Sequence, residues 1–295
     1  MPEVSVILPN FNHAKYLKSR IESILTQSFQ DFELLIFDDA STDESLEVIK
    51  GFSDSPKIKL VESNQENSGS TFIQWSKGFE KADGKYIWIA ESDDLADPRF
   101  LETHLNIFKE NPKVGLSFSA SSWIDENGEI IHQPEHENSF IKPGSELLKN
   151  ELGKGTFIYN ASSCVFKKEL IPWEKLDQMM KYKYCGDWLF WIGFAEKTVF
   201  SRDSKRLNMF RRHNQNVSFK SETEGLQFSE GFQVLGYLLE KHEFTFTEKF
   251  KLLFHWTLKL HKSHSNNKRQ FLAALPFLAR WAYALSSVLV LLKLR

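Results

Sequence analysis

The sequence predicts an α/β protein with a mostly parallel sheet flanked by helices and a helical extension at its C-terminal end. Three observations lead to this prediction. Short β-branched runs alternate with helical patterns over the first 112 residues, polar motifs follow three of these runs, and the chain beyond about residue 225 is mainly helical in pattern. Strands that alternate with helices form parallel sheets with both faces covered, and ligands lie beyond the carboxyl ends of the strands.

Hydrophobic periodicity predicts the first two strand and helix pairs. VSVILP, residues 4–9, is a β-branched run, and apolar residues then recur at helical spacing in residues 17–25. The second strand, FELLIFDDA, is followed by STDESLEVIK, in which Ser41 stands three residues before Glu44. This spacing is typical of a capping box, so we expect a second helix to begin there.

The following segments repeat this order. KIKLVES is the third expected strand, TFIQWSKGFEKADGK is a helix that closes at Gly84, and YIWIAE is the fourth strand. Asp97 and Pro98 are typical of an N-cap and a first-turn proline, which predicts a helix over RFLETHLNIFKEN. Beyond residue 113, VGLSFSASSWID is expected as a strand and ENGEIIHQPEHENSF as a turn and loop. GFQVLGYLLEKHEF and FKLLFHWTLKLHK are amphipathic helices.

Composition places the chain among globular enzymes. Its 295 residues suit one large domain, or one domain with a smaller appendage, and 41% are hydrophobic and 26% charged. A formal charge of −2 leaves no basic excess, which excludes a general nucleic-acid binder. Cys164 and Cys185 are too few for a disulfide framework or a four-ligand zinc site, so we expect buried, reduced thiols in a cytoplasmic protein.

The two ends of the chain differ. MPEVSVILPN lacks the basic and apolar parts of a signal peptide, so we expect the mature chain to start there. Residues 271–295 are the most apolar part, but Pro276 and Arg280 interrupt them, and a spanning helix needs about 20 apolar residues. Two interpretations stay open: a helix that lies in a membrane surface, or one that packs on the domain or in a homodimer.

Three polar motifs are expected to meet at one crevice beyond the strand ends: PNFN (9–12), DDAS (38–41) and ESDD (91–94). Carboxylates this close raise one another's pKa unless a cation or hydrogen-bond donors balance them. Mg²⁺ or Mn²⁺ takes oxygen ligands and is often shared with substrate phosphates. We therefore expect Asp93 and Asp94 to bind such an ion and, through it, a diphosphate. Asp38 is expected to brace its loop, and Asp39 to accept hydrogen bonds from a nucleobase or ribose.

A further group of candidate residues lies in KYCGDWLFWIGFAEK. Asp187 precedes a helical run rich in aromatic residues, and such surroundings raise the pKa of a carboxyl toward the range of a general base. A role for Asp187 as the N-cap of this helix is compatible with catalysis. Trp188 and Trp191 are candidates for stacking on the sugar rings of an acceptor, with core packing the better explanation for at least one of them.

Together these motifs resemble family-2 glycosyltransferases of the GT-A fold. The likeness is dense over VSVILPNFNHAKYLKSRIESILTQSFQDFELLIFDDASTDES and ADGKYIWIAESDD, and thinner to about residue 220. It implies a GT-A domain at 1–220, with a nucleotide-binding half at 1–112 and an acceptor half at 113–220. The helical region at 221–295 follows this domain, and for its end the two interpretations given above, membrane or protein contact, stay open. It also implies inverting transfer of a sugar from a UDP, dTDP or GDP donor to a hydroxyl of a saccharide or lipid-linked acceptor. Such transfer serves bacterial cell-surface polysaccharide or lipopolysaccharide synthesis at the inner face of the membrane.

The resemblance also implies roles for single residues. Pro9 and Phe11, with Asn12 beside them, would line the nucleobase pocket, and Asp39 would contact the base. For Phe11 a place in the hydrophobic core is an equally good explanation. Asp93 would lie near the ribose and the metal waters, Asp94 would ligate the metal, and Asp187 would be the catalytic base, with Gly186 in place of the family's usual glutamate. FRRHNQNVS resembles the family's late Arg-x-His segment, so His213 would complete the metal shell and Arg211 or Arg212 would neutralise phosphate charge.

One departure and two alternative functions accompany this interpretation. Many relatives carry an Arg-Asn pair in the helix before the fourth strand, whereas this chain has Trp75 and Ser76, with Gln74 or Lys77 as replacements. A sugar-nucleotide nucleotidyltransferase would need a glycine-rich or basic phosphate loop, which LPNFNHAKYL does not offer. A non-catalytic carbohydrate-binding relative would keep the aromatic residues but not need the acidic ones. No Gln-x-x-Arg-Trp segment is present, which favours single addition over processive synthesis.

Overall fold

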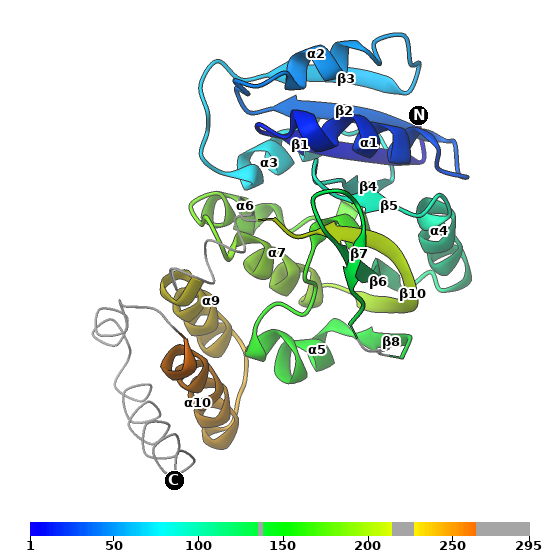
Figure 1. Ribbon diagram of the computed structural model, residues 1–295. Coiled ribbons are helices and arrows are strands. Elements are labelled where there is room, and N and C mark those ends of the chain that lie inside the picture. Colours follow the sequence, from blue (N-terminus) through cyan, green and yellow to red (C-terminus); the bar gives the residue numbers. More distant parts are fainter. Residues whose placement is uncertain (135–137, 214–226, 264–295) are drawn as a thin grey trace.

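The strands of the first half form the parallel part of one large sheet. The computed structural model describes residues 1–134, 138–213 and 227–263. Strands β1 (Val4–Asn10), β2 (Phe32–Asp38), β3 (Ile58–Ser63) and β4 (Tyr86–Ile89) lie in the order β3-β2-β1-β4 and run parallel (Figure 1). Asn10 pairs in register with Asp38, so the ends of β1 and β2 lie side by side.

The second half extends this sheet with mixed strand directions. Its path continues through β9 (Cys164–Lys167), β6 (Val114–Ile124), β10 (Val199–Arg211) and β5 (Leu95–Ala96). Strand β9 is antiparallel to β4 and β6, and β10 is parallel to β6. Two short strands, β7 (Ile130–His132) and β8 (Phe140–Pro143), pair with β6 and β10. Strand β7 lies within ENGEIIHQPEHENSF, where the sequence predicted a turn and loop without a strand.

Helices cover both faces of the sheet. One core lies under α1 (Ala14–Leu25) and α4 (Phe100–Glu110), and it includes Val4, Val6 and Leu8 of β1. The other lies under α3 (Thr71–Lys81) and α7 (Gly186–Ala195), and it includes Ile7. The remaining helices are α2 (Ser45–Lys50), α5 (Gly144–Asn150), α6 (Trp173–Met179), α9 (Gln227–Lys241) and α10 (Phe246–Lys262), with short 3₁₀ turns at Leu152–Lys154, Ala161–Ser163 and Lys168–Leu170. Strands β1 and β2 are buried along their whole length, as expected for strands packed on both faces.

Two expected helix starts were wrong, for the same reason. Helix α2 begins at Ser45 without a capping box, because the Ser41 hydroxyl donates to Asp38 Oδ1 at 2.6 Å. Helix α4 begins at Phe100, and the Asp97 carboxylate accepts a hydrogen bond from the backbone N–H of Arg99 at 2.9 Å. In both cases the side chain is bonded within the loop that leaves a strand, so it does not cap the helix.

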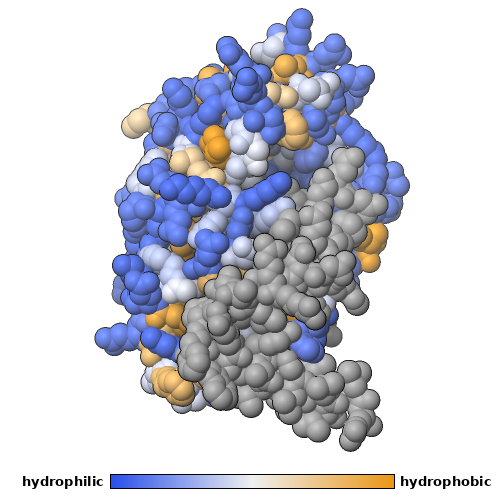
Figure 2. Space-filling view, turned by 90° about the vertical axis from the view of Figure 1, so that its left-hand side faces the viewer, coloured by the Kyte–Doolittle hydropathy of each residue, from blue (hydrophilic) through white to orange (hydrophobic). Residues whose placement is uncertain are grey.

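The C-terminal helices pack against the second half. Trp256 of α10 stacks on Trp188 of α7, with ring centroids 5.0 Å apart. The helix expected at 271–295 lies outside the described residues, and within the described ranges no helix combines the length and apolarity needed to cross a membrane. Figure 2 shows one face of the molecule, on which hydrophilic residues predominate and apolar ones lie scattered. Cys164 and Cys185 are both free and buried, as predicted.

Candidate functional site

The loops that follow β1, β2 and β4 are bonded to one another. The Asn10 side-chain amide donates to Asp38 Oδ1 at 2.8 Å, and Asn12 Oδ1 accepts from the backbone N–H of Thr42 at 2.7 Å. His13 Nδ1 and Ser92 Oγ share a hydrogen bond of 2.8 Å. The three polar motifs predicted to meet at the strand ends therefore lie together at the carboxyl ends of these strands.

Asp38 and Asp39 face different partners. Asp38 accepts hydrogen bonds from Asn10, Ser41 and Ser63, which makes it a brace for its own loop. Asp39 is 5% exposed. Its Oδ1 accepts from Asn64, the Ser68 backbone and Gln74, and its Oδ2 accepts from the Ser68 hydroxyl at 2.8 Å. Oδ1 is thus fully used by protein donors, whereas Oδ2 accepts one hydrogen bond from the described residues and has room for another.

The helix before β4 contacts the site through side chains that the sequence only partly indicated. Gln74 donates to Asp39, whereas Lys77 pairs with Glu62 at 3.1 Å. The Trp75 indole N–H donates to Glu91 Oε1 at 2.8 Å. Burial and the charge of Asp93 raise the pKa of Glu91 to about 8. Trp75 thus holds a carboxyl group at the position where many relatives carry an arginine.

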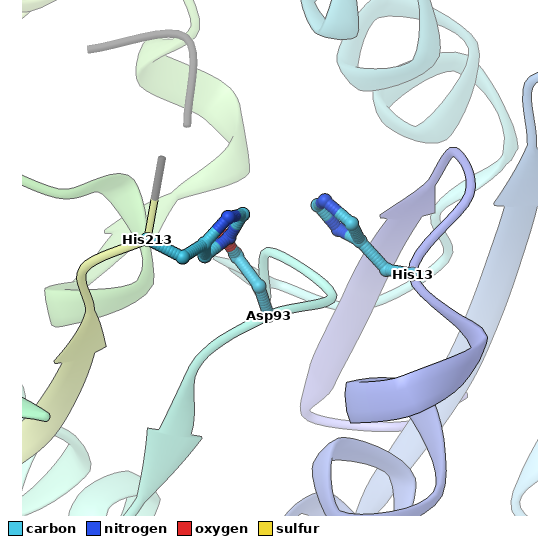
Figure 3. Close-up of side chains that lie close together, drawn as sticks. All are labelled: His13, Asp93 and His213. Carbon is cyan, nitrogen blue, oxygen red and sulfur yellow. The ribbon is translucent and has the colours of Figure 1, made fainter. Parts of the chain in front are cut away.

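His13, Asp93 and His213 form a cluster suited to a metal ion (Figure 3). Their potential ligand atoms all lie within 4.8 Å of one another, and His213 Nε2 is 3.1 Å from Asp93 Oδ2. Burial raises the pKa of Asp93, but the hydrogen bond from His213 and the charges of both histidines outweigh it, so the pKa lies below the usual value. Two imidazole nitrogens and one carboxylate fit a divalent transition ion such as Mn²⁺ better than Mg²⁺, which prefers oxygen ligands.

Asp94 is placed differently from its neighbour. It is fully buried, its Oδ2 accepts from the Asn160 amide at 2.8 Å, and its Oδ1 accepts from the Arg211 backbone N–H at 3.0 Å. Burial and the charge of Asp93 raise its pKa to about 7. The structure therefore groups Asp93, and not Asp94, with His213.

The side chains of Arg211 and Arg212 lie in different surroundings. Arg211 is buried, its Nε donates to the Asp93 carbonyl and its Nη1 to the Asp125 carbonyl, both at 2.6 Å. It therefore braces the acidic turn. The Arg212 guanidinium lies over the Trp123 ring at 5.1 Å.

A buried arginine lies behind the acidic turn. Arg20 of α1 has no exposed surface, and its guanidinium lies 5.0 Å from the Trp88 ring. Within the part of the chain that the structure describes, its three nitrogens have no hydrogen-bond partner. Burial lowers its pKa to about 10, opposed by the charges of Asp94, Asp93 and Glu91. Arg20 is thus a countercharge for the three carboxylates. Its position on the apolar side of an amphipathic helix was the only sequence signal for it.

Asp187 lines a separate cavity of about 280 Å³. Its Oδ1 accepts from the Trp188 backbone N–H at 2.8 Å, and burial raises its pKa to about 7. The cavity wall contains aromatic residues and two cations; the lining consists of Trp123, Gly155, Thr156, Tyr159, Tyr184, Cys185, Asp187, Trp188, Phe210, Arg212, Gln227, Trp256 and Lys259. Trp188 is 2% exposed and its indole N–H donates to the Leu152 carbonyl. Trp191 is fully buried among aromatic side chains, with no ring face open to a sugar.

Helix α3 links the two parts of the site. The Phe72 ring lies against Gly186, directly before Asp187, and its centroid is 5.1 Å from that of Trp75, which bonds Glu91. A Cβ at position 186 would lie 2.6 Å from the Phe72 ring. A side chain at this position would therefore require Phe72 or the Met179 carbonyl to move. At the other end of the site, Pro9 is buried and Phe11 is 42% exposed.

Comparisons with known proteins identify the family of this chain. A family model described as glycosyl transferase family 2 matches residues 5–172. An uncharacterized glycosyltransferase of Methanocaldococcus jannaschii is 32% identical over 193 residues, which cover 65% of this chain and 64% of that protein. Poly(ribitol-phosphate) beta-N-acetylglucosaminyltransferase TarP of Staphylococcus aureus is 29% identical over 208 residues, 65% of this chain and 63% of TarP. The matches thus span less than two thirds of these relatives.

Two solved structures share the fold. S. aureus TarS in complex with UDP-GlcNAc has a TM-score of 0.69 at 18% identity, over 96% of this chain and 79% of that one. Mannosyltransferase PcManGT from Pyrobaculum calidifontis, in complex with GDP-Man and Mn²⁺, has a TM-score of 0.60 at 16% identity, over 98% and 81%. At these identities the likeness concerns the fold alone, and it confirms the predicted GT-A architecture.

Proposed function

This chain belongs to glycosyl transferase family 2, and from this premise we propose that it is an inverting, metal-dependent glycosyltransferase that uses a nucleoside-diphosphate sugar. The observation that carries the proposal is the meeting of three strand ends at the cluster of His13, Asp93 and His213, with Asp187 in a cavity joined to it through α3. Family membership favours this function over nucleotidyl transfer, and the buried acidic groups favour it over mere carbohydrate binding.

The donor nucleotide binds at the carboxyl ends of β1 and β2. Pro9, Phe11 and Asn12 line the pocket for the base, and the open acceptor direction of Asp39 Oδ2 receives an N–H of the base. The complexes of TarS with UDP-GlcNAc and PcManGT with GDP-Man support a UDP- or GDP-sugar as donor, and a dTDP-sugar stays a prediction from the sequence.

His13, Asp93 and His213 hold the divalent ion, Mn²⁺ in preference to Mg²⁺. When bound, this ion supplies positive charge that stabilises the diphosphate as it leaves. This assignment replaces Asp94 by Asp93 as the carboxylate ligand. Asp94 instead fixes the turn through Asn160 and Arg211, and Arg211 acts on the nucleotide only through the groups that it positions.

Asp187 is the catalytic base. It accepts the proton of the acceptor hydroxyl while that oxygen attacks the anomeric carbon from the face opposite the nucleotide. The bond from the anomeric carbon to the diphosphate oxygen breaks, its electron pair leaves with the diphosphate, and the configuration inverts. A pKa of about 7 suits a base that must be ionised before the reaction and protonated after it.

The acceptor is a saccharide or a lipid-linked saccharide of bacterial cell-surface polysaccharide or lipopolysaccharide synthesis, at the inner face of the membrane. Residues 1–112 supply the donor site and residues 113–220 much of the acceptor site. Trp188 exposes only a small part of its surface to the acceptor. Membrane contact, or a homodimer, through residues 271–295 stays a prediction from the sequence.

A thermal-shift screen of nucleoside diphosphates and their sugars, with and without MnCl₂, tests this function. A ligand that binds only the native state raises the melting temperature, so one nucleotide class should do so and Mn²⁺ should increase the shift. The Asp187→Asn variant should keep this shift and lose nucleoside diphosphate release by 10²-fold or more, on the order expected for a general base. Asp177→Asn, an exposed aspartate of α6, is the matched control. If no nucleotide stabilises the protein, or if Asp187→Asn turns over normally, the proposal is wrong.

A further inference from the structure

The turn before Asp187 is bonded to a helix of the C-terminal region. The backbone N–H groups of Lys183, Tyr184 and Cys185 donate to the carboxylate of Glu230, at 2.8, 2.7 and 2.9 Å. Glu230 lies in the first turn of α9, whereas the three donors directly precede α7. One side chain of α9 thus holds three consecutive backbone groups at the start of the helix that bears Asp187.

These three hydrogen bonds satisfy a need of α7. The N–H groups at the beginning of a helix have no acceptor within the helix, so they require one from elsewhere. Cys185, the residue before α7, gives no side-chain cap. Glu230 brings negative charge to the end of the helix where it is favourable, and hydrogen bonds to an ionised acceptor are roughly twice as strong as neutral ones. The contact between α9 and the turn is therefore both strong and directional.

The residue after Asp187 is fixed by the same region of the chain. A Cβ at Gly231 of α9 would lie 2.7 Å from the Trp256 ring and 3.7 Å from the Trp188 ring, so α9 lies directly against both rings. The Trp188 ring also stacks on Trp256 of α10. Asp187 thus lies between a turn that is bonded to α9 and a tryptophan that packs on α9 and α10.

This support matters because a catalytic base must be placed accurately. A general base works within hydrogen-bond distance of the hydroxyl that it deprotonates, and a displacement of about 1 Å can lower the rate about 10²-fold. Among the described residues, the Asp187 carboxylate accepts a hydrogen bond only from the backbone N–H of Trp188. Its position therefore depends on the backbone of the turn, and so on the group that holds this backbone.

We propose that Glu230 is a positioning residue for the transfer reaction, which places Asp187 through the turn at 183–185 and makes the C-terminal helices part of the active site. This inference rests on the proposed function. The match to the family model ends at residue 172 and does not include α9, and the sequence predicted a domain that ends at residue 220. The hydrogen bonds of Glu230 cross that boundary, so α9 serves catalysis as well as packing.

Two substitutions of Glu230 separate its reach from its charge. Glu230→Asp keeps the charge but is shorter by one methylene, so kcat should fall by about tenfold or more while the pH profile keeps its midpoint. Burial raises the pKa of Asp187 to about 7, and the charge of Glu230 adds to this rise. Glu230→Gln removes the charge at nearly constant size, so the acid limb of kcat/KM should move to lower pH. The other ionisable groups in the cavity wall stay the same: Tyr159, Tyr184, Cys185, Arg212 and Lys259.

Two controls distinguish positioning from general damage to the fold. Glu240→Gln, an exposed glutamate of the same helix, should keep the wild-type kcat and pH profile. The rise in melting temperature caused by the nucleotide should be equal in the wild type and in all three variants, because Glu230 acts on the base and not on the donor site. A loss of nucleotide binding that matches the loss of kcat would overturn the inference.

Carbon-13 NMR of the Asp187 side chain examines the same contact without turnover. The pKa of the Asp187 carboxyl group should fall in Glu230→Gln and keep its wild-type value in Glu240→Gln. An unchanged pKa in Glu230→Gln, or a wild-type kcat in Glu230→Asp, would overturn the inference even where the proposed function holds. Failure of the nucleotide screen with the wild type would refute the proposed function, and this inference with it, whatever the NMR titration shows.

Discussion

At the scale of single residues, the protonation of Asp187 sets the pH range of activity. Burial raises its pKa to about 7, and only the ionised form can accept the acceptor proton. We therefore expect kcat/KM to rise tenfold per pH unit below about pH 7 and to level off above it. Initial rates of nucleoside diphosphate release between pH 5.5 and 9 check this. A rate that falls as the pH rises through 7 would show that Asp187 is not the base.

The same shift predicts a stability gain on losing the carboxylate. The folded-state pKa of Asp187 lies above its ordinary value of 3.8, so ionisation destabilises the fold, and the penalty grows as the pH rises from about 4 to 7 and then stays constant. Asp187→Asn should raise the free energy of unfolding by at least about 1 kcal/mol at pH 8. Urea unfolding at pH 8 and pH 5 should show a smaller gain at the lower pH, and a loss of stability at pH 8 would contradict the argument.

Arg20 gives a prediction in which stability depends on the metal. Its buried charge compensates Glu91, Asp93 and Asp94, so Arg20→Met leaves these carboxylates without their countercharge. Breaking such a buried arrangement costs about 3–5 kcal/mol. A bound divalent ion supplies charge to the same group, so the loss measured by urea unfolding should be smaller in MnCl₂ than in EDTA. An equal loss of unfolding free energy in MnCl₂ and in EDTA would show that Arg20 and the metal ion do not compensate the same carboxylates.

These residues also show what the sequence could predict at this scale. The position of acidic motifs at strand ends was readable, because strands can be recognised and their carboxyl ends share one edge. Which of Asp93 and Asp94 turns toward His213 depends on the geometry of one tight turn, in which Asp94 N–H donates to the Glu91 carbonyl. His13 directly follows PNFN, which was the available signal for it.

At the scale of elements, the contact of α3 with α7 explains the glycine before Asp187. A Cβ at position 186 would lie 2.6 Å from the Phe72 ring and 2.8 Å from the Met179 carbonyl. Gly186→Ala should therefore lower the free energy of unfolding by about 1–3 kcal/mol, as for other overpacked sites. Phe72→Leu in the same chain should recover part of this loss, which a double-mutant cycle in urea measures. Strict additivity of the two changes would exclude direct contact as the cause.

Strands were easier to predict than their pairing or the caps of the helices. Strands β1, β2 and β4 are apolar runs and β3 alternates between half-buried and exposed residues, and all four occur where periodicity placed them. Strands β7 and β8 pair with β6 and β10, and neither has a buried run of its own. Ser41 and Asp97 had the right spacing for caps, but each side chain is hydrogen-bonded within its own loop. The Ser41 hydroxyl donates to Asp38, and the Asp97 carboxylate accepts from the Arg99 backbone N–H.

At the scale of the whole molecule, the candidate metal site joins both halves of the sheet. His13 follows β1, Asp93 follows β4 and His213 follows β10, so the cluster exists only when the parallel and mixed parts of the sheet are packed together (Figures 1 and 3). A ligand that binds only this folded arrangement stabilises the entire chain. The family resemblance could indicate His213, but the distance between these three segments depends on packing that no local pattern contains.

This assembly makes the identity of the carboxylate ligand testable. Mn²⁺ binding, followed by electron paramagnetic resonance titration, should weaken about tenfold or more in Asp93→Asn and His13→Ala, since each removes a ligand atom or its charge. His132→Ala, an exposed histidine of β7, should bind as the wild type does. Asp94→Asn should keep most of its Mn²⁺ affinity, because the Asp94 oxygens already accept from Asn160 and from the Arg211 backbone N–H. A larger loss of Mn²⁺ affinity in Asp94→Asn than in Asp93→Asn would show that Asp94 is the metal ligand, as the family resemblance implied.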